Sequence, residues 1–309
     1  MKHFAISGAC GAIPARSPLT GLEDDEDGMS EQSFKRFRRR RAPAAPSADG
    51  GTGAAEPQQR TAPAAPPQVQ LPARLPEPWD RIRQVPFDTG VEQAARLPLV
   101  SRFRTSPAAK SFDLLRTRLL HSLKARGWNR VAVTAPAAGC GTTFSAVNLA
   151  LSLARVPGSR TILMDLNFRR PGMARALGIE TQGDLSAFLS GSTRIEDQFV
   201  RPLPSLAVGL NRSADQDAAE LLHSGSCAEA LDAMMLRSGA DTALFDLPPV
   251  LEHDDTAAFL PQVDAVLLIS DGTRTTAAQL AACEKMLAGH TELLGVVLNR
   301  ARDTDSPLN

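Results

Sequence analysis

Residues 130–154 of this chain read RVAVTAPAAGCGTTFSAVNLALSLA, and this stretch decides the fold. It begins with an apolar run, Val131 to Val133, which is typical of a buried strand. A loop of small residues follows at 136–141, and apolar side chains at helical spacing come after it. Strand, glycine-rich loop and helix in this order predict a phosphate-binding loop, because loop amides and a helix N-terminus together attract an anion.

One position of this loop departs from the usual motif. The motif ends in Gly-Lys-[Ser/Thr], and Thr142 stands where the lysine is expected. Glycine at 139 and 141 lets the backbone approach a phosphate closely, and Thr143 stands where the motif binds magnesium. The residues expected to surround the phosphates are Ala138, Gly139, Cys140, Gly141, Thr142, Thr143 and Phe144.

Composition narrows the class of protein. The 309 residues are 43% hydrophobic and carry no net charge, so bulk charge favours no particular partner. No apolar run approaches the length of a membrane span, and the N-terminal residues lack the apolar centre of a signal peptide. The four cysteines show neither metal-ligand nor disulfide spacing, so we expect a reduced, cytoplasmic compartment. The sequence contains no tyrosine, so none of its residues can be autophosphorylated on tyrosine.

The N-terminal third differs in composition from the rest. An acidic block at 23–27 and a basic block at 34–41 precede a tract with ten prolines between 43 and 86. Proline at this density predicts extended, solvated chain, so we expect a disordered tail over 1–105. The charge blocks favour a tail whose halves attract each other; contact of Arg38 to Arg41 with anionic lipid, an acidic partner or nucleic acid is the alternative.

From Ser106 onward, strands and helices alternate. The predicted strands are 130–135, 160–165, 206–210, 242–246, 264–270 and 293–299. The predicted helices are 109–125, 143–155, 184–190, 216–222, 226–237, 254–260 and 275–288. Short apolar strands separated by helices predict an α/β domain, doubly wound, with a mainly parallel sheet and helices on both faces. We expect it to span 106–303, followed by a short C-terminal tail at 304–309.

Two aspartates end apolar strands of this sheet. Asp165 follows one strand, and Asp246 follows another and precedes Leu-Pro-Pro. Taken alone, Asp165 is better explained as a helix-capping or loop aspartate than as a functional residue. Ligands of such sheets bind at the carboxyl ends of the strands, where the 136–143 loop also lies. Both aspartates are therefore predicted to be catalytic, and Thr143 with Asp246 is predicted to hold Mg²⁺.

These motifs resemble a known family. In order along the chain they are FDLLRT (112–117), NLA (148–150), MDLNFRRP (164–171), GDLSAFLSG (183–191), ELL (220–222), FDLPP (245–249) and LLGVVLNR (293–300). The stretch from about 107 to 303 is similar to bacterial tyrosine kinases of the CpsD/CapB group of exopolysaccharide biosynthesis proteins, within the MinD/ParA-like class of P-loop ATPases.

The resemblance implies ATP and Mg²⁺ as cofactors and assigns further roles. Arg169 and Arg170 would lie near the nucleotide or a neighbouring subunit, and Asn299 near the adenine. It also implies a membrane-spanning polysaccharide co-polymerase as partner, a Wzz-like chain-length determinant. We expect that partner on a separate chain, with only peripheral membrane contact, a homo-oligomer as a further option and no nucleic acid.

At four places the sequence departs from the family pattern, and each change would weaken the kinase activity of the family. Thr142 replaces the P-loop lysine, and Asn167 replaces the second aspartate of the Asp-x-Asp motif. The helical positions that bear an acidic residue and two arginines in relatives hold Lys110, Asp113 and Arg116. The tail after Ala301 has no tyrosine cluster. These changes predict ATP binding with weak or no hydrolysis.

Three alternatives remain open from the sequence. One is an active ATPase, or a kinase of other proteins, in which Arg169 or Arg170 supplies the missing cation. Another is a scaffold that binds no nucleotide. The third is a partition-type protein that binds DNA through Arg38 to Arg41.

Overall fold

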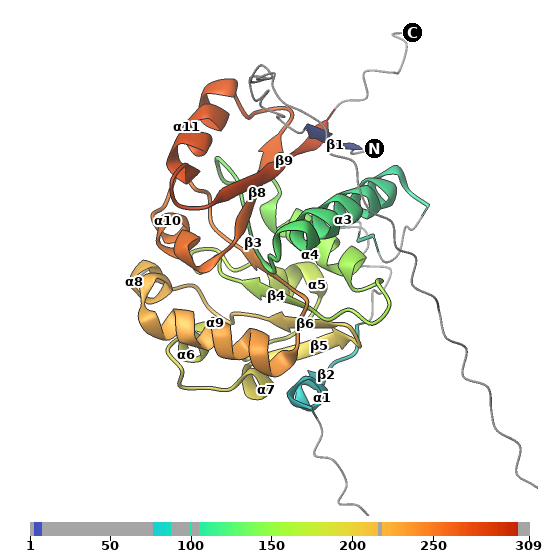
Figure 1. Ribbon diagram of the computed structural model, residues 1–309, viewed down its shortest axis with the longest axis vertical. Coiled ribbons are helices and arrows are strands. Elements are labelled where there is room, and N and C mark those ends of the chain that lie inside the picture. The colour runs from blue at the N-terminus through green and yellow to red at the C-terminus, as the bar shows by residue number, and fades with distance from the viewer. Residues whose placement is uncertain (1–2, 8–76, 88–98, 101–104, 216–217, 302–309) are drawn as a thin grey trace, which may run out of the picture. The chain divides into compact units, whose positions relative to one another are not determined.

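The computed structural model describes residues 3–7, 77–87, 99–100, 105–215 and 218–301, and all of these belong to one compact unit. They form a nine-stranded sheet in the order β1-β9-β8-β3-β7-β4-β6-β5-β2 (Figure 1). The strands are β1 (His3–Ser7), β2 (Arg83–Gln84), β3 (Arg130–Thr134), β4 (Thr161–Asp165), β5 (Phe199–Leu203), β6 (Leu206–Gly209), β7 (Thr242–Asp246), β8 (Ala265–Asp271) and β9 (Glu292–Ala301). Pairing is parallel except for β1 with β9 and β5 with β6.

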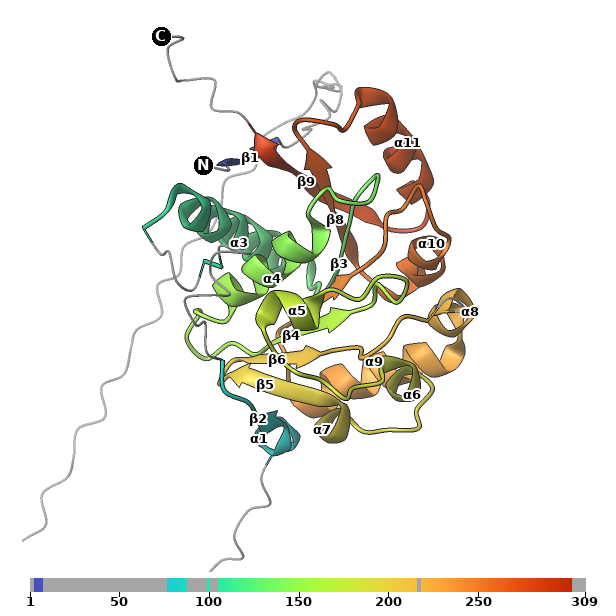
Figure 2. The same ribbon diagram turned by 180° about the vertical axis from the view of Figure 1, so that it is seen from behind.

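Helices cover both faces of the sheet. They are α1 (Pro78–Arg81), α3 (Pro107–Arg126), α4 (Thr142–Leu153), α5 (Met173–Leu177), α6 (Leu185–Leu189), α7 (Ile195–Gln198), α8 (Ala218–His223), α9 (Gly225–Ser238), α10 (Asp255–Phe259) and α11 (Ala277–Leu287), with a 3₁₀ turn at Leu260–Gln262. Helices α3, α4 and α5 pack on one face (Figure 2), and α6, α8, α9, α10 and α11 pack on the other. The doubly wound fold class predicted from the sequence is thus confirmed.

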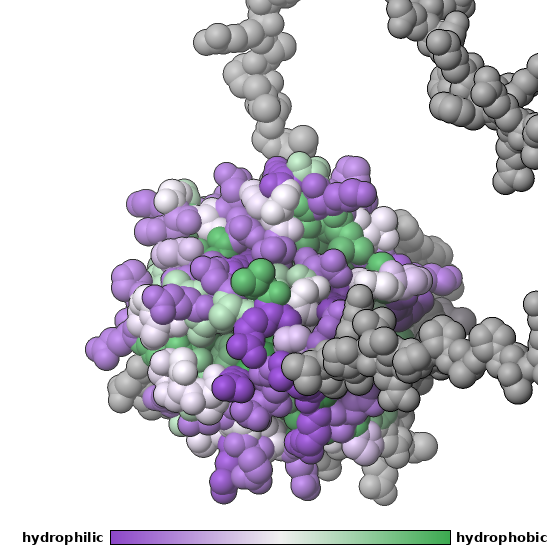
Figure 3. Space-filling model, turned by 60° about the horizontal axis from the view of Figure 1, so that its bottom comes forward, coloured by the Kyte–Doolittle hydropathy of each residue, from purple (hydrophilic) through white to green (hydrophobic). Residues whose placement is uncertain are grey.

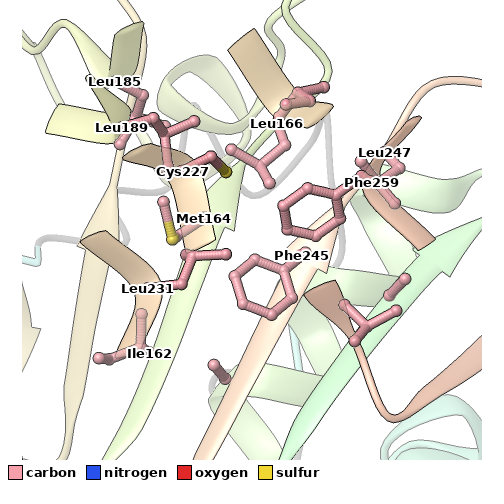
Figure 4. Packing of buried hydrophobic residues seen from close by; sticks show 14 of the residues in the cluster. Ile162, Met164, Leu166, Leu185, Leu189, Cys227, Leu231, Phe245, Leu247 and Phe259 are labelled. Carbon is pink, nitrogen blue, oxygen red and sulfur yellow. The ribbon is translucent and has the colours of Figure 1, made fainter. Parts of the chain in front are cut away.

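Strand side chains alternate between the two layers, as the pleat requires. On β7, Phe245 packs in the layer of α8 and α9, whereas Leu244 packs under α4. Phe245 meets Phe259 of α10 edge to face, with ring centroids 5.0 Å apart (Figure 4). Figure 4 shows Ile162 and Met164 of β4 pointing toward Leu231 of α9 in the same layer. This packing fixes the strand ends that carry Asp165 and Asp246.

The six predicted strands and seven predicted helices are present, each within two residues of its predicted bounds. Strand β5 was not predicted, because its sequence FVRPL contains a proline and follows α7 without a turn signal. Short helices α5 and α7 were missed for lack of length, since one turn shows no periodicity.

The prediction of a tail over 1–105 needs a correction at two places. Strand β1 pairs with β9, and 77–84 dock on the opposite edge of the sheet through β2. Trp79 is 2% exposed, and its Nε1 donates to the carbonyl oxygen of Pro204 at 3.0 Å. One large aromatic ring can anchor a short segment that proline-rich composition would leave solvated. The charge blocks at 23–27 and 34–41, most of the proline tract and the tail 304–309 lie outside the described residues.

The face at the bottom of Figure 1 carries α1, α7 and α9. Figure 3 shows it as mainly hydrophilic, with hydrophobic residues in small separate groups. Within the part of the chain that the structure describes, no helix is both long and apolar enough to cross a bilayer.

Candidate functional site

The loop between β3 and α4 has the backbone of an anion cradle. Gly139 and Gly141 have φ of 81° and 95°, in the left-handed region that glycine favours. Gly141 caps α4, which begins at Thr142, so the first amides of a twelve-residue helix point into the loop. This is the arrangement in which a helix N-terminus receives a phosphate.

Strand β9 braces the loop from one side. Asn299 is 3% exposed, and its Nδ2 donates to the carbonyl oxygen of Cys140 at 2.7 Å. Arg300 donates to the carbonyl oxygen of Gly139 at 2.9 Å and pairs with Asp271 at the end of β8. Asn299 therefore holds the loop backbone in shape, and its contact with adenine stays a prediction.

Tight packing at Gly141 leads to a testable expectation. A Cβ there would lie 2.1 Å from Asn299 Nδ2, whereas at Gly158, with φ of 74°, it would meet nothing within 4 Å. Gly158→Ala should cost about 1–2 kcal/mol for the left-handed backbone alone. Gly141→Ala should cost roughly 1 kcal/mol more, because Asn299 must move. Urea denaturation of the two variants checks this, and equal losses would contradict the bracing role of Asn299.

Asp165 and Asp246 come together at the carboxyl ends of neighbouring strands. They are register partners of β4 and β7, and both are fully buried. Asp165 Oδ2 accepts from the amides of Gly172 and Met173, each at 3.0 Å, so this oxygen caps α5. Asp165 Oδ1 and both Asp246 oxygens have no hydrogen-bond partner of good geometry among the described residues.

Burial perturbs both carboxyl groups. It raises the pKa of Asp165 to about 6, although amides of Met173, Gly172 and Asn167 oppose it. Burial and then the charge of Asp165 raise the pKa of Asp246 well above its ordinary range, and the Thr143 hydroxyl lowers it. Unpaired buried oxygens beside a hydroxyl are what a cation would satisfy.

These groups suit Mg²⁺ held together with a phosphate. No cluster of three or more His, Cys, Asp or Glu side chains that could hold a metal occurs in the described ranges. Mg²⁺ commonly binds through one or two carboxylates and takes its other ligands from substrate phosphates and water. The ligands from the protein would be Asp246, Thr143 and Asp165.

A cavity of about 200 Å³ opens beside the loop. It is lined by Ala138, Gly139, Gly141, Thr142, Thr143, Phe144, Asn167, Arg169, Arg170, Leu247, Pro249, Glu252 and His253. Six of the seven predicted loop contacts line it; Cys140 is buried behind it at 3% exposure. The structure thus brings together the predicted loop residues, Asn167 and both arginines.

The two arginines of this cavity differ in their surroundings. Arg169 Nε lies 2.5 Å from Oδ2 of Asp255, a buried carboxylate at the start of α10, and its Nη2 lies 3.5 Å from Asp254. Arg170 is exposed, and no carboxylate of the described residues pairs with its guanidinium. Of the two arginines that line the cavity, Arg169 is therefore held toward α10, and Arg170 is the one available for an added anion.

Comparisons with known proteins identify proteins similar to this chain. No family model matches the chain. Over 206 residues, 65% of its length, the chain is 31% identical to the putative tyrosine-protein kinase EpsB of Ralstonia nicotianae, and this match spans only 27% of that relative. The kinase domain of VpsO is 28% identical with a TM-score of 0.54, over 62% of this chain and 95% of that one. The BceF tyrosine kinase domain is 26% identical with a TM-score of 0.58, over 70% and 90%.

The chain is similar in sequence and fold to bacterial tyrosine kinase domains. It departs from the motifs of that family at Thr142 and Asn167, which line the cavity where the motifs have lysine and aspartate.

The helix that carries the altered family pattern is engaged within the chain. Asp113 of α3 accepts from Arg116 at 3.0 Å, from Arg155 at 2.9 Å and from Ser152 at 2.7 Å. Arg116 also donates to the carbonyl oxygen of Ser152. The one position that matches the family, Arg116, therefore ties α3 to α4 here.

Sequence reasoning missed three parts of the site. It did not identify Asp255 as the partner of Arg169, Asp271 as the partner of Arg300, or Glu252 as a contact of the loop. Asp255 and Glu252 follow the Pro-Pro turn after β7, a segment whose path only the fold determines. The signal that could have found them is position, since both come shortly after a strand that ends at the site.

Proposed function

We propose that this protein binds ATP with Mg²⁺ at the 136–143 loop, hydrolyses it weakly or not at all, and regulates exopolysaccharide or capsular polysaccharide assembly without tyrosine autophosphorylation. It would act in the cytoplasm, at the inner membrane through a partner. The chain covers about a quarter of its first curated relatives, so the whole-protein activity rests on this proposal.

The supporting observation is a site that has the phosphate-binding loop and the candidate metal ligands but lacks the lysine of the P-loop motif. The loop, Thr143 and the buried Asp165–Asp246 pair retain the form of a nucleotide site. Thr142 carries no charge, and Arg169 is committed to Asp255. Transition-state charge is then less well stabilised than bound ground-state phosphate, which reduces turnover more than binding.

Calorimetry and a turnover assay test this proposal on the full chain. MgATP at physiological salt should give saturable binding, and phosphate release should be at least 100-fold slower than for a lysine-bearing relative, since one charged contact in the transition state contributes about 2.7–4 kcal/mol. Gly141→Ala is the binding control. Hydrolysis at the rate of ordinary relatives would exclude the weak-turnover proposal.

The exposed guanidinium of Arg170 favours one alternative, an active ATPase or a kinase of other proteins. In that case Arg170→Gln should abolish turnover that the wild type has. Arg118→Gln, an exposed arginine of α3, is the matched control.

A scaffold for a membrane polysaccharide co-polymerase is the other alternative, and it needs no nucleotide. Co-purification with a Wzz-like chain-length determinant, in the presence and absence of MgATP, separates the two. Co-purification that depends on MgATP supports a regulator, and co-purification that is the same with and without MgATP supports a scaffold. A homo-oligomer would appear in the same purification by light scattering.

A further inference from the structure

Glu252 places a carboxylate on the phosphate-binding loop. Its Oε1 accepts a hydrogen bond from the backbone amide of Ala138 at 2.7 Å. The same side chain lines the cavity together with Thr142 and Arg170. One loop amide that would otherwise be free for a phosphate is therefore occupied by an anion of the protein itself.

The position of this contact indicates which phosphate it opposes. The amides from Gly141 onward belong to the start of α4, next to Thr143 and the metal ligands. Ala138 lies earlier in the loop, and Glu252 reaches it from the segment after β7, the strand that ends in Asp246. Asn299 braces the loop from β9 and does not line the cavity. Glu252 thus occupies the cavity side of the loop, where a terminal phosphoryl group would extend.

The charges around the cavity make an extra phosphate costly. Glu252 adds a carboxylate to the lining of the cavity. Thr142 supplies no charge, and Arg169 is paired with Asp255. Arg170 remains as a cation exposed to solvent, where screening weakens its attraction.

We propose that Glu252 makes this site selective for a nucleoside diphosphate over a triphosphate. This inference rests on the proposed function, since it concerns the same nucleotide site. A diphosphate uses the amides at the start of α4 and leaves the Glu252–Ala138 bond in place. A triphosphate brings one more negative charge, and it must displace the carboxylate or lie against it.

The Glu252 carboxylate competes only with the terminal phosphate of a triphosphate. Removing Glu252 should therefore improve triphosphate binding and leave diphosphate binding nearly unchanged. Because Glu252 is exposed, its charge is partly screened, and we expect a change of roughly fivefold.

The experiment is calorimetric titration of the full chain with MgADP and MgATP. The variants are Glu252→Ala, Glu252→Gln and the control Glu229→Gln, an exposed carboxylate of α9 that lines a different cavity. The wild type and Glu229→Gln should bind MgADP roughly fivefold more tightly than MgATP. Glu252→Ala should bring the two affinities within about twofold, and Glu252→Gln should shift the ratio in the same direction because it removes the charge. Melting temperatures verify that each variant is folded.

The outcomes separate this inference from the proposed function. A wild type that prefers MgATP, or a Glu252→Ala variant that changes both affinities equally, overturns the selectivity and leaves the nucleotide site intact. Absence of binding by either nucleotide in every folded variant overturns the proposed function, and the selectivity falls with it.

Discussion

Replacing Thr142 by lysine should tighten MgATP binding about 10- to 100-fold, because a hydrogen bond to a charged group is worth about 1.5–3 kcal/mol in a partly desolvated site. Thr142 is half-buried, begins α4 and lines the cavity, so a longer side chain has space to reach a bound phosphate. The lysine would lie where the P-loop motif places its contact with the β- and γ-phosphates.

Turnover should respond as well as binding. The lysine amine stabilises charge that grows on the transferred phosphoryl group, so the rate of phosphate release should rise with affinity. A cation at a helix N-terminus costs about 0.3–1 kcal/mol of stability, so the variant should melt slightly below the wild type without nucleotide.

Thr142→Met is the matched control, since it adds length without charge. It should leave MgATP affinity within about threefold of the wild type. If Thr142→Lys changes neither affinity nor turnover, the missing lysine does not limit this site. If Thr142→Met improves binding as much as lysine does, packing rather than charge is responsible.

Much of the site was predictable because its signals are local. The loop glycines, Thr143 and the strand-end aspartates each follow from a few neighbouring residues, and β4 and β7 then bring Asp165 beside Asp246. Interactions between distant segments were not predictable. Arg169 pairs with Asp255 across 86 positions, and Glu252 meets Ala138 across 114. Such pairs depend on loop paths that no local pattern encodes.

The N-terminal part illustrates the same limit. The density of prolines in a segment predicts how that segment behaves in isolation. It carries no information about a surface, formed by distant strands, on which the segment can pack. The indole of Trp79 donates a hydrogen bond to the carbonyl oxygen of Pro204. The guanidinium carbon of Arg160 lies 5.5 Å from the centroid of the Trp79 ring. One burial of this size outweighs the local preference for solvated chain over 77–84.

Asp246→Asn should stabilise the nucleotide-free protein and abolish the benefit of Mg²⁺. Burial raises the pKa of Asp246 well above its ordinary range, so its ionised form opposes folding near neutral pH. Asparagine keeps the shape and removes the charge, and the free energy of unfolding at pH 7 should rise by about 1–3 kcal/mol. For a domain of this size that is about 2–4 °C in melting temperature per kcal/mol.

The pH dependence gives the sign of the effect. A carboxyl group whose pKa is raised on folding binds its proton more tightly in the folded state, so stability falls as pH rises from the unfolded toward the folded pKa. Asp165, with its pKa moved from 3.8 to about 6, contributes such a loss of roughly 3 kcal/mol across that window. The gain from Asp246→Asn should therefore be larger at pH 7 than near pH 4.

Asp271→Asn is the control, because this buried strand-end carboxylate has the opposite perturbation. Burial opposes its ionisation, but Thr273, Arg300 and Arg274 outweigh burial and lower the pKa of Asp271. Its ionised form therefore contributes stability that is present at pH 7 and lost as pH falls, so this variant should be less stable than the wild type at pH 7.

Nucleotide binding distinguishes a metal ligand from a carboxylate that is merely buried. Mg²⁺ should strengthen ATP binding to the wild type about 100-fold, since the metal stabilises phosphate charge by several kcal/mol, and this difference should vanish in Asp246→Asn. A variant that is stabilised but keeps its full Mg²⁺ dependence would show that another group holds the metal. If the variant is instead less stable than the wild type at pH 7, Asp246 already has a partner in the folded protein. A buried carboxylate stabilises the folded state only when a partner compensates its charge.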